Sequence, residues 1–233
     1  MASEKILVVD DDPAIRNLIT RYLTQQGYEV ESANDGQTAL EIFDRFSPDL
    51  VVLDVNLPDT TGFTLCQEMQ SRTSVFVLML TSLTGEADKI RGFDKGADDY
   101  ITKPFGLAEL GARVKAILKR QRSITDNEPR SLTYGDILID PARREVHIKD
   151  QMIQLSALEF DLLYCLASKP GRAWRRSELL QAVWDYDYEG EQRVVDVHIG
   201  QIRKKIEPNV SKPTLIKTIR GIGYMFDRRA KER

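Results

Sequence analysis

The stretch Leu50-Val51-Val52-Leu53-Asp54 places four apolar residues directly before a carboxylate. An apolar run of this length is typical of a central parallel strand that is buried on both faces. The segment Ile6-Leu7-Val8-Val9 has the same character and runs into Asp10-Asp11-Asp12. Ligand sites of open α/β sheets lie at the carboxyl ends of such strands, so both segments should deliver carboxylates to one edge of a sheet.

Strand-like and helix-like segments alternate over the first half of the chain. Apolar strands are predicted at 6–10, 29–33, 50–54, 76–81 and 100–104. Amphipathic helices are predicted at 13–26, 35–46, 62–71, 84–95 and 106–120. Five strand–helix units in succession predict an α/β fold, a five-stranded parallel sheet with helices on both sides.

The second half of the chain has a different pattern. Residues 121–130 are polar and lack periodicity, which is typical of a linker. Short strands are predicted at 132–140 and 144–149, helices at 156–168, 175–183 and 192–206, and a terminal hairpin over 214–226. We therefore predict a first domain over 1–120, a linker over 121–130 and an α+β domain with an antiparallel sheet over 131–233.

Composition and charge limit the kinds of protein that the chain can be. The 233 residues suffice for two ordinary domains, and 42% of them are apolar. No apolar run could cross a bilayer and no signal segment opens the chain, so we expect a cytoplasmic protein without a membrane partner. Residues 1–124 carry 14 Lys and Arg against 19 Asp and Glu, whereas residues 192–231 carry 10 against 3. An acidic front and a basic end predict two domains with different partners.

Polar side chains end or follow four of the predicted strands. They are Asp10 with Asp11, Asp54, Thr81 and Lys103. Carboxylates at one sheet edge repel one another unless a cation lies among them, and hard oxygen ligands suit Mg²⁺. With this ion, the Lys103 ammonium and the Thr81 hydroxyl to hold a phosphoryl group, Asp54 becomes a candidate nucleophile toward phosphorus. A strand-end Asp is more often a helix cap, and we expect Asp12 to be one.

Residues 4–120 resemble the receiver domain of response regulators, which implies a five-stranded parallel (βα)5 fold of the flavodoxin-like type. The resemblance rests on Val9-Asp10-Asp11, Leu53-Asp54-Val55-Asn56-Leu57-Pro58, Leu80-Thr81-Ser82 and the segment 96–105. It implies that Asp54 is the phosphoacceptor, that Lys103 contacts the phosphoryl group before a cis bond to Pro104, and that Thr81 and Tyr100 form a switch pair.

The same resemblance implies a cofactor and a phosphoryl donor. The cofactor is Mg²⁺, held by Asp10, Asp11, Asp54 and the backbone carbonyl of Asn56. The donor is a sensor histidine kinase, which we expect to dock near residues 14–18, at Ala14, Ile15 and Leu18.

Two other functions stay open at this point. One is a phosphatase with an aspartyl nucleophile, but haloacid-dehalogenase-like enzymes place a second acid two residues after the nucleophile, where this chain has Asn56. The other is an architectural DNA-binding protein whose receiver is always in its active state. The chain lacks a Gly-x-x-x-x-Gly-Lys-Ser/Thr loop, which speaks against a nucleoside triphosphatase.

The segment 193–206 predicts a helix that is apolar on one side and basic elsewhere. Val195, Ile199, Ile202 and Ile206 recur at helical spacing. A basic helix that follows another helix and a loop suits the major groove of double-stranded DNA, and the glycine-tipped hairpin after it suits backbone or minor-groove contacts. The predicted DNA-contacting residues are Arg193, Val197, His198, Gln201, Arg203, Lys204, Lys217, Thr218 and Arg220.

Residues 131–228 resemble the winged helix-turn-helix effector of the OmpR/PhoB subfamily. The matching motifs are Leu-Ser-Ala-Leu-Glu-Phe-Asp-Leu-Leu at 155–163, Val-Val-Asp-Val-His-Ile at 194–199 and Thr-Ile-Arg-Gly-Ile-Gly-Tyr at 218–224. The resemblance implies that helix 192–206 reads bases, that hairpin 214–226 is the wing and that loop 184–191 can meet RNA polymerase. Family members often have basic residues where this chain has Gly200 and Gln201, so site preference should not be transferred from a relative.

In the resembled subfamily, phosphorylated receivers pair as homodimers through their fourth and fifth helices. Cross-subunit pairs Lys89–Glu109, Asp99–Arg113 and Asp94–Lys115 would fit around an apolar centre. We expect phosphorylation to favour this dimer, so that two linked effectors bind adjacent half-sites. The predicted dimer face consists of Lys89, Ile90, Asp94, Asp99, Glu109, Leu110, Arg113 and Lys115.

Overall fold

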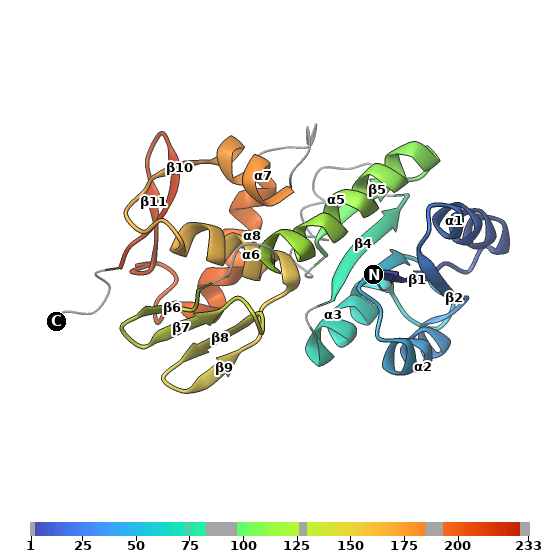
Figure 1. Cartoon of the computed structure of the whole chain (residues 1–233), viewed down its shortest axis with the longest axis horizontal. Helices are drawn as coiled ribbons and strands as arrows, with labels where there is room; N and C mark the ends of the chain where they lie inside the picture. Colours follow the sequence, from blue (N-terminus) through green and yellow to red (C-terminus); the bar gives the residue numbers. More distant parts are fainter. Residues whose placement is uncertain (1–2, 74, 83–96, 126–129, 185–192, 229–233) are drawn as a thin grey trace. The chain divides into compact units, whose positions relative to one another are not determined.

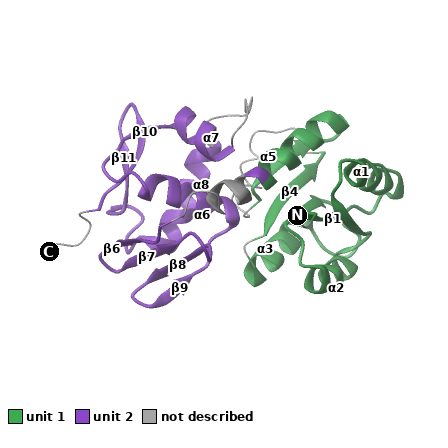
Figure 2. Cartoon of the chain, viewed as in Figure 1, with its two compact units in different colours: residues 1–118 green, residues 119–233 purple. Residues whose placement is uncertain are grey.

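The structure is a computed structural model that describes residues 3–73, 75–82, 97–125, 130–184 and 193–228. The chain divides into two units, residues 1–118 and residues 119–233 (Figure 2). A search of the described residues finds no helix with the length and apolar character that a membrane crossing requires.

Five parallel strands form the sheet of the first unit. They are β1 (Lys5–Val9), β2 (Glu29–Ala33), β3 (Leu50–Asp54), β4 (Phe76–Thr81) and β5 (Asp99–Thr102). Their spatial order is β2-β1-β3-β4-β5, which confirms the flavodoxin-like fold. β3 and β4 are buried along their whole length, as expected of strands that are covered on both faces.

Helices cover both faces of this sheet. Helices α1 (Pro13–Gln25) and α5 (Leu107–Thr125) lie on one face, and α2 (Gly36–Phe46) and α3 (Gly62–Arg72) lie on the other (Figure 1). The helix predicted over 84–95 falls outside the described residues.

Carboxylate side chains fix where two of these helices begin. Asp12 accepts hydrogen bonds from the backbone nitrogens of Ala14 and Ile15, at 2.8 and 3.4 Å, and Pro13 takes the first helical position. The prediction that Asp12 is a helix cap is confirmed. Asp35 caps α2 in the same way, accepting from the backbone nitrogen of Thr38 at 2.7 Å.

The last helix of the first unit is longer than predicted. The prediction ended it at residue 120, but α5 continues to Thr125, through the first half of the segment interpreted as a linker. Residues 119–122, Lys-Arg-Gln-Arg, are strong helix formers, and no Gly or Pro interrupts the chain before Pro129. A polar composition was therefore mistaken for an absence of helix.

Two antiparallel sheets frame the second unit. One has the order β6-β7-β8-β9, and the other has the order β10-β12-β11. The single strand predicted over 132–140 is in fact a hairpin, because Gly135 adopts a positive φ of 59° and turns the chain. The strands are β6 (Leu132–Tyr134), β7 (Ile137–Asp140), β8 (Glu145–Ile148), β9 (Gln151–Ile153), β10 (Trp174–Arg175), β11 (Ile216–Ile219) and β12 (Gly223–Phe226).

Three helices fill the space between these sheets, namely α6 (Ala157–Ala167), α7 (Arg176–Trp184) and α8 (Arg193–Ile206). α6 packs against both other helices and against β12. The apolar face predicted for α8 is confirmed, because Val195, Ile199, Ile202 and Ile206 are all buried. The helix order and the hairpin β11–β12 give the winged helix-turn-helix arrangement that the sequence predicts.

Candidate functional site

The predicted acidic pocket lies at the carboxyl edge of the first sheet. Asp10 follows β1, Asp54 ends β3, Thr81 ends β4 and Lys103 follows β5. The parallel register keeps these ends level, since Asp54 pairs with Leu80. Asp10, Asp54 and Thr81 are almost fully buried, so the pocket is walled by the sheet itself.

Lys103 joins two of the carboxylates. Its ammonium donates to Asp10 Oδ2 at 2.8 Å and to Asp54 Oδ2 at 2.9 Å. The peptide bond between Lys103 and Pro104 is cis, as the resemblance to receiver domains implies. One cation between two carboxylates offsets the repulsion that would otherwise make the cluster unfavourable.

The electrostatics of the pocket reflect both burial and pairing. Burial raises the pKa of the Asp10 carboxyl above its ordinary value, although the hydrogen bond from Lys103 opposes this. Burial alone would lower the pKa of Lys103, but its bonds to Asp10 and Asp54 outweigh that effect and raise the pKa. Lys103 therefore stays charged, and Asp10 is a buried carboxyl that further positive charge would stabilise in its ionised form.

The residues of the pocket fit a divalent cation. One carboxylate oxygen from each of Asp10, Asp11 and Asp54 can be chosen so that all three lie within 4.8 Å of one another. Asp11 is exposed and the other two are buried, which leaves one open side for water or substrate. Three hard oxygen donors with room for water are what Mg²⁺ prefers.

The backbone after Asp54 is held in place by contacts that the sequence analysis missed. The nitrogen of Gly62 donates to the carbonyl of Val55 at 2.8 Å. A Cβ atom at Gly62 would lie 2.1 Å from the carbonyl oxygen of Asp54, so only glycine allows this approach. Asp59 accepts hydrogen bonds from the backbone nitrogens of Gly36 and Gln37, at 2.9 and 3.0 Å. Both residues follow Asp54 closely, and the glycine could have been suspected from its position at the first residue of a predicted helix.

The predicted switch pair lies beside the pocket. Thr81 and Tyr100 belong to the neighbouring strands β4 and β5, and both side chains are buried. Burial raises the pKa of the Tyr100 hydroxyl well above its ordinary value. Asn56 is exposed and pairs with Thr61 in an isolated antiparallel bridge, which closes the loop after β3.

Among the described residues, only some members of the predicted dimer face are exposed. Leu110 is fully buried, so it belongs to the core of the unit. We therefore withdraw the prediction that Leu110 is part of the dimer face. Arg113 donates to both carboxylate oxygens of Asp99 at 3.0 and 2.9 Å within the same chain. Glu109 and Lys115 are exposed. The remaining members, Lys89, Ile90 and Asp94, fall outside the described residues.

The residues of α8 that we predicted to contact DNA fall into an outer and an inner group. Lys204 is exposed, and Val197 and Gln201 are half-buried. His198 is 1% exposed, and its ring lies 6.0 Å from the ring of Trp184. A helix turns about 100° per residue, so position 198 falls on the buried side with position 199, and we remove His198 from the DNA-contacting set.

Arg203 also turns inward. Its guanidinium donates to the carbonyl oxygen of Ile216 at 3.0 and 2.7 Å and to the hydroxyl of Thr218 at 2.9 Å. These bonds join α8 to strand β11, so we correct Arg203 from a DNA contact to a residue that fastens the helix to the hairpin. A planar guanidinium with five donors suits such a role.

On the hairpin, Thr218 and Arg220 are exposed, whereas Lys217 pairs with Asp227 across the hairpin. The side chain of Arg193 falls outside the described residues. Of the loop predicted over 184–191, Trp184 ends α7 and is fully buried, whereas residues 185–191 fall outside the described residues. The exposed and half-buried residues that face outward are therefore Val197, Gln201, Lys204, Thr218 and Arg220.

A second cluster around Asp196 was not predicted. Asp196 accepts hydrogen bonds from Arg176 Nε and from the Tyr224 hydroxyl, both at 2.7 Å. Burial, with the bond to Asp196, raises the pKa of Tyr224 to about 12. The cluster connects α7, α8 and β12. Two of its members lie in motifs quoted above, but spacing alone does not show that they meet.

Two family models match the chain. The response regulator receiver domain matches residues 6–115, and the C-terminal domain of transcriptional regulatory proteins matches residues 150–226. The first covers the acidic pocket and the second covers α8 and the hairpin. The fold and site thus define a two-domain response regulator whose output domain binds DNA.

Relatives match along nearly the whole chain. The alkaline phosphatase synthesis regulator PhoP of Bacillus subtilis is 43% identical and covers 97% of both chains. The transcriptional regulator RpaA of Synechocystis is 41% identical and covers 98% of this chain and 97% of its own length. The chain belongs to the OmpR/PhoB-type response regulators and is a two-component transcriptional regulator.

Solved structures agree with this assignment. A mutant of RitR superposes with a TM-score of 0.83 at 28% identity, over 97% of this chain and 99% of its own. DrrB of Thermotoga maritima, described as an OmpR/PhoB homologue, gives a TM-score of 0.52 at 37% identity, over 97% of this chain and all of its own.

Proposed function

We propose that Asp54 accepts a phosphoryl group from a sensor histidine kinase and that this controls DNA binding by the second unit. The observation that carries the proposal is the contact of Lys103 with both Asp10 and Asp54 at one edge of the sheet. Asp10, Asp11, Asp54 and the backbone carbonyl of Asn56 would hold Mg²⁺. A charged lysine fixed beside the acceptor is positioned for the oxygens of an incoming phosphoryl group.

In the transfer, a carboxylate oxygen of Asp54 attacks the phosphorus of a phosphohistidine. The O–P bond forms as the P–N bond breaks, and the histidine nitrogen keeps the electron pair of the broken bond. Lys103 contacts one phosphoryl oxygen as a point charge, and the Thr81 hydroxyl donates to another. The metal, when bound, neutralises charge on the phosphoryl oxygens. Ala14, Ile15 and the exposed Leu18 on α1 form the proposed kinase contact.

The signal leaves the pocket through Thr81 and Tyr100. Capture of the Thr81 hydroxyl by the phosphoryl group favours one arrangement of the Tyr100 side chain and of the face that follows β5. That face then forms a homodimer in which Glu109 and Lys115 are exposed contacts. Pairing of Asp99 with Arg113 across the dimer requires that their bond within the chain opens.

Dimerisation places two DNA-binding units on adjacent half-sites, so each tethered unit binds at a raised effective concentration. We propose that α8 enters the major groove with Gln201 and Lys204 facing the DNA, and that Thr218 and Arg220 contact the backbone. A contact of loop 184–191 with RNA polymerase is part of the same proposal.

Incubation with acetyl phosphate and Mg²⁺ tests the acceptor. We expect a mass increase of about 80 Da, the mass of HPO₃, on Asp54. Asp54→Ala should remove it, whereas the matched Asp12→Asn, which keeps a good helix cap, should be labelled like the natural chain. An unlabelled natural chain, or full labelling of Asp54→Ala, refutes the proposal.

Beryllofluoride separates phosphorylation control from a receiver that is always active. We expect sedimentation to show more dimer, and operator affinity to rise, when beryllofluoride and Mg²⁺ are added. If both stay the same in a chain that acetyl phosphate labels, the second interpretation, an architectural DNA-binding protein, replaces the first.

The hairpin contact is tested by salt dependence. Arg220→Ala should weaken DNA binding and lower the slope of log affinity against log salt by about 1. Arg143→Ala, an exposed arginine in the turn between β7 and β8, is the matched control and should leave the slope unchanged. An unchanged slope for Arg220→Ala removes this residue from the interface.

A further inference from the structure

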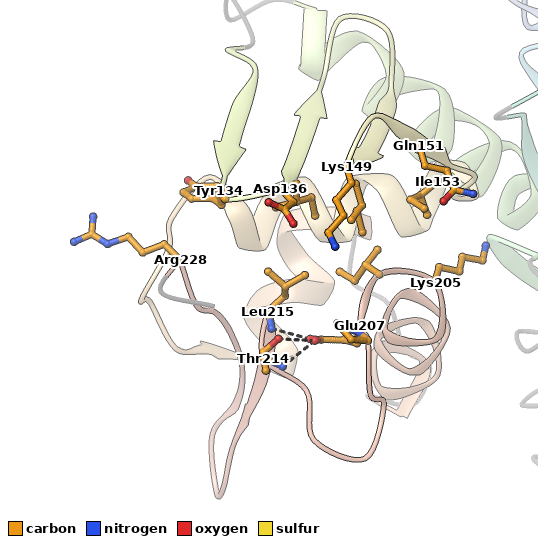
Figure 3. Close-up of a pocket in the computed structure, with 15 residues that line it drawn as sticks. Tyr134, Asp136, Lys149, Gln151, Ile153, Lys205, Glu207, Thr214, Leu215 and Arg228 are labelled. Atoms are coloured by element: carbon orange, nitrogen blue, oxygen red, sulfur yellow. Dashed lines mark hydrogen bonds between the residues drawn. The ribbon is translucent and has the colours of Figure 1, made fainter. Parts of the chain in front are cut away.

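The second unit contains a cavity that the proposed function does not use. Its volume is about 410 Å³, within the roughly 300–1,000 Å³ of small-molecule sites. The turns and strands of the sheet β6–β9 form one wall, and the end of α8 with the segment leading to β11 forms the other (Figure 3). The cavity lies within a single unit, so its shape depends only on elements that pack on one another.

The wall on the α8 side is rigidly built around Glu207. Its carboxylate accepts from the backbone nitrogens of Thr214 and Leu215, each at 2.8 Å, and from the Thr214 hydroxyl at 3.1 Å (Figure 3). It also accepts from the backbone nitrogen of Ile216 at 2.8 Å. Four donors occupy this carboxylate, so it has little capacity left for a ligand cation. It also fixes the end of α8 to the start of the hairpin.

The cationic groups of the cavity differ in whether they are already engaged. Lys205 donates to Glu159 Oε2 at 2.6 Å. The guanidinium of the exposed Arg228 extends away from the cavity (Figure 3). Lys149 lies in the β8–β9 turn with φ 50°, and its ammonium points into the space that faces Leu215 (Figure 3). Within the described part of the chain, the Lys149 ammonium makes neither a hydrogen bond nor an ion pair. Lys149 is therefore available for an anionic group.

The rest of the lining selects the size and charge of a ligand. Ile148, Ile153 and Leu215 are half-buried and offer apolar surface, with the buried Ile137 beside them. Asp136 lines the same wall as Lys149 and would repel a multiply charged anion such as phosphate. An apolar body with a single negative charge matches this lining.

We propose that this cavity binds a small amphipathic carboxylic acid, with its carboxylate on Lys149 and its apolar body against the isoleucines and Leu215. Because Glu207 joins one wall to the base of the hairpin, occupancy of the cavity stabilises the link between α8 and β11. The site is separate from the acidic pocket and does not depend on phosphorylation.

A matched set of probes tests the chemistry on the full-length chain. The probes are 4-phenylbutyrate, its amide and 4-phenylbutylamine, which share a phenylalkyl body and carry a negative, a neutral and a positive head group. We expect 4-phenylbutyrate to shift the isoleucine methyl NMR signals of the cavity saturably and to bind about fivefold more tightly than the amide. The amine should bind most weakly.

Variants then assign the preference to one residue. Lys149→Gln should reduce the affinity for 4-phenylbutyrate to that for the amide, whereas Lys212→Gln, an exposed lysine outside the cavity, should change nothing. Ile153→Phe, which narrows the cavity, should weaken the acid and the amide together. The proposal is overturned by equal affinities of the three probes, by methyl shifts that do not saturate at millimolar probe, or by a charge preference that survives in Lys149→Gln.

Discussion

The acidic pocket of the first unit and helix α8 of the second use charged side chains in opposite ways. In the pocket, charges from separate strands converge, and Lys103 meets Asp10 and Asp54. On α8 they diverge, since Arg203 turns inward to β11 while Lys204 points outward. In the pocket, the role of a charged side chain is set by its neighbours. On α8, the role is set by whether the side chain is exposed to solvent.

The difference follows from geometry. Parallel strands end at a common edge, so the sheet fixes the position of a residue at a strand end. A helix presents a new direction at each residue, and a long side chain can fold back onto its own unit. Substitutions in both regions would contradict or sharpen this contrast.

The largest effect is expected from Gly62→Ala, at the rim of the acidic pocket. The added Cβ would lie 2.1 Å from the carbonyl oxygen of Asp54 and 2.9 Å from the Cα of Val55. Both are backbone atoms, so β3 and α3 must separate, which should lower the free energy of unfolding by about 3 kcal/mol. Urea denaturation measures the loss, and labelling by acetyl phosphate should slow because Asp54 moves.

Gly106→Ala is the matched control, because nothing lies within 4 Å of a Cβ atom at that position. It should lower the free energy of unfolding by no more than about 1 kcal/mol, because Gly106 directly precedes α5 and alanine is a poorer helix N-cap than glycine. Equal stability of the two variants would show that the backbone after Asp54 is not held as tightly as the pocket requires.

The next effect is expected from Arg203→Ala in the second unit. The substitution removes two bonds to Ile216 and one to Thr218, as well as the stacking of the guanidinium 5.4 Å from the Tyr224 ring. Loss of hydrogen bonds from a charged donor should lower stability by about 2 kcal/mol. Thermal and urea unfolding without DNA measure this.

Lys204→Ala separates the inner from the outer charges of α8. We expect little change in stability, because this lysine is exposed, but a salt slope of DNA binding that falls by about 1. If Arg203→Ala were as stable as Lys204→Ala, Arg203 would return to the DNA-contacting set and the contrast between the two regions would weaken.

These two regions also show which features of the structure can be predicted from the sequence. The parallel sheet and the meeting of Asp10, Asp54 and Lys103 followed from apolar runs that end in polar residues, because the ends of parallel strands share one edge of the sheet. The buried state of His198 and Leu110 did not follow, since both depend on how a helix rotates against its neighbours. The bonds of Asp59 and Asp196 join segments that are distant in sequence, and no local pattern encodes them.

A smaller effect of opposite sign is expected from Gly200→Ala in α8. Glycine at an open position inside a helix loses more conformational entropy on folding than alanine does. Nothing lies within 4 Å of a Cβ atom at Gly200, so alanine should raise the free energy of unfolding by about 0.5–1 kcal/mol. Urea denaturation of the unbound chain measures the gain, and a loss would mean that the helix is packed more closely there.

The smallest effect is expected from Asp59→Asn, beside the acidic pocket. Hydrogen bonds from the backbone nitrogens of Gly36 and Gln37 hold the pKa of this exposed carboxyl below its ordinary value. A carboxyl with a lowered folded-state pKa stabilises the fold above its ordinary pKa, and the contribution is lost as the pH falls through the lowered value. The variant should therefore be less stable than the natural chain at pH 7, and the difference should shrink in acid.

Urea denaturation of both chains at neutral and at acidic pH measures that difference. Glu29→Gln is the matched control, because this exposed carboxylate of the same unit makes no hydrogen bond among the described residues, and the substitution should leave stability nearly unchanged. A constant difference for Asp59→Asn across pH would assign the role of Asp59 to shape instead of charge. The hydrogen bonds of Asp59 would then hold the segment after Asp54 through their geometry, and charge would matter in this region only inside the pocket.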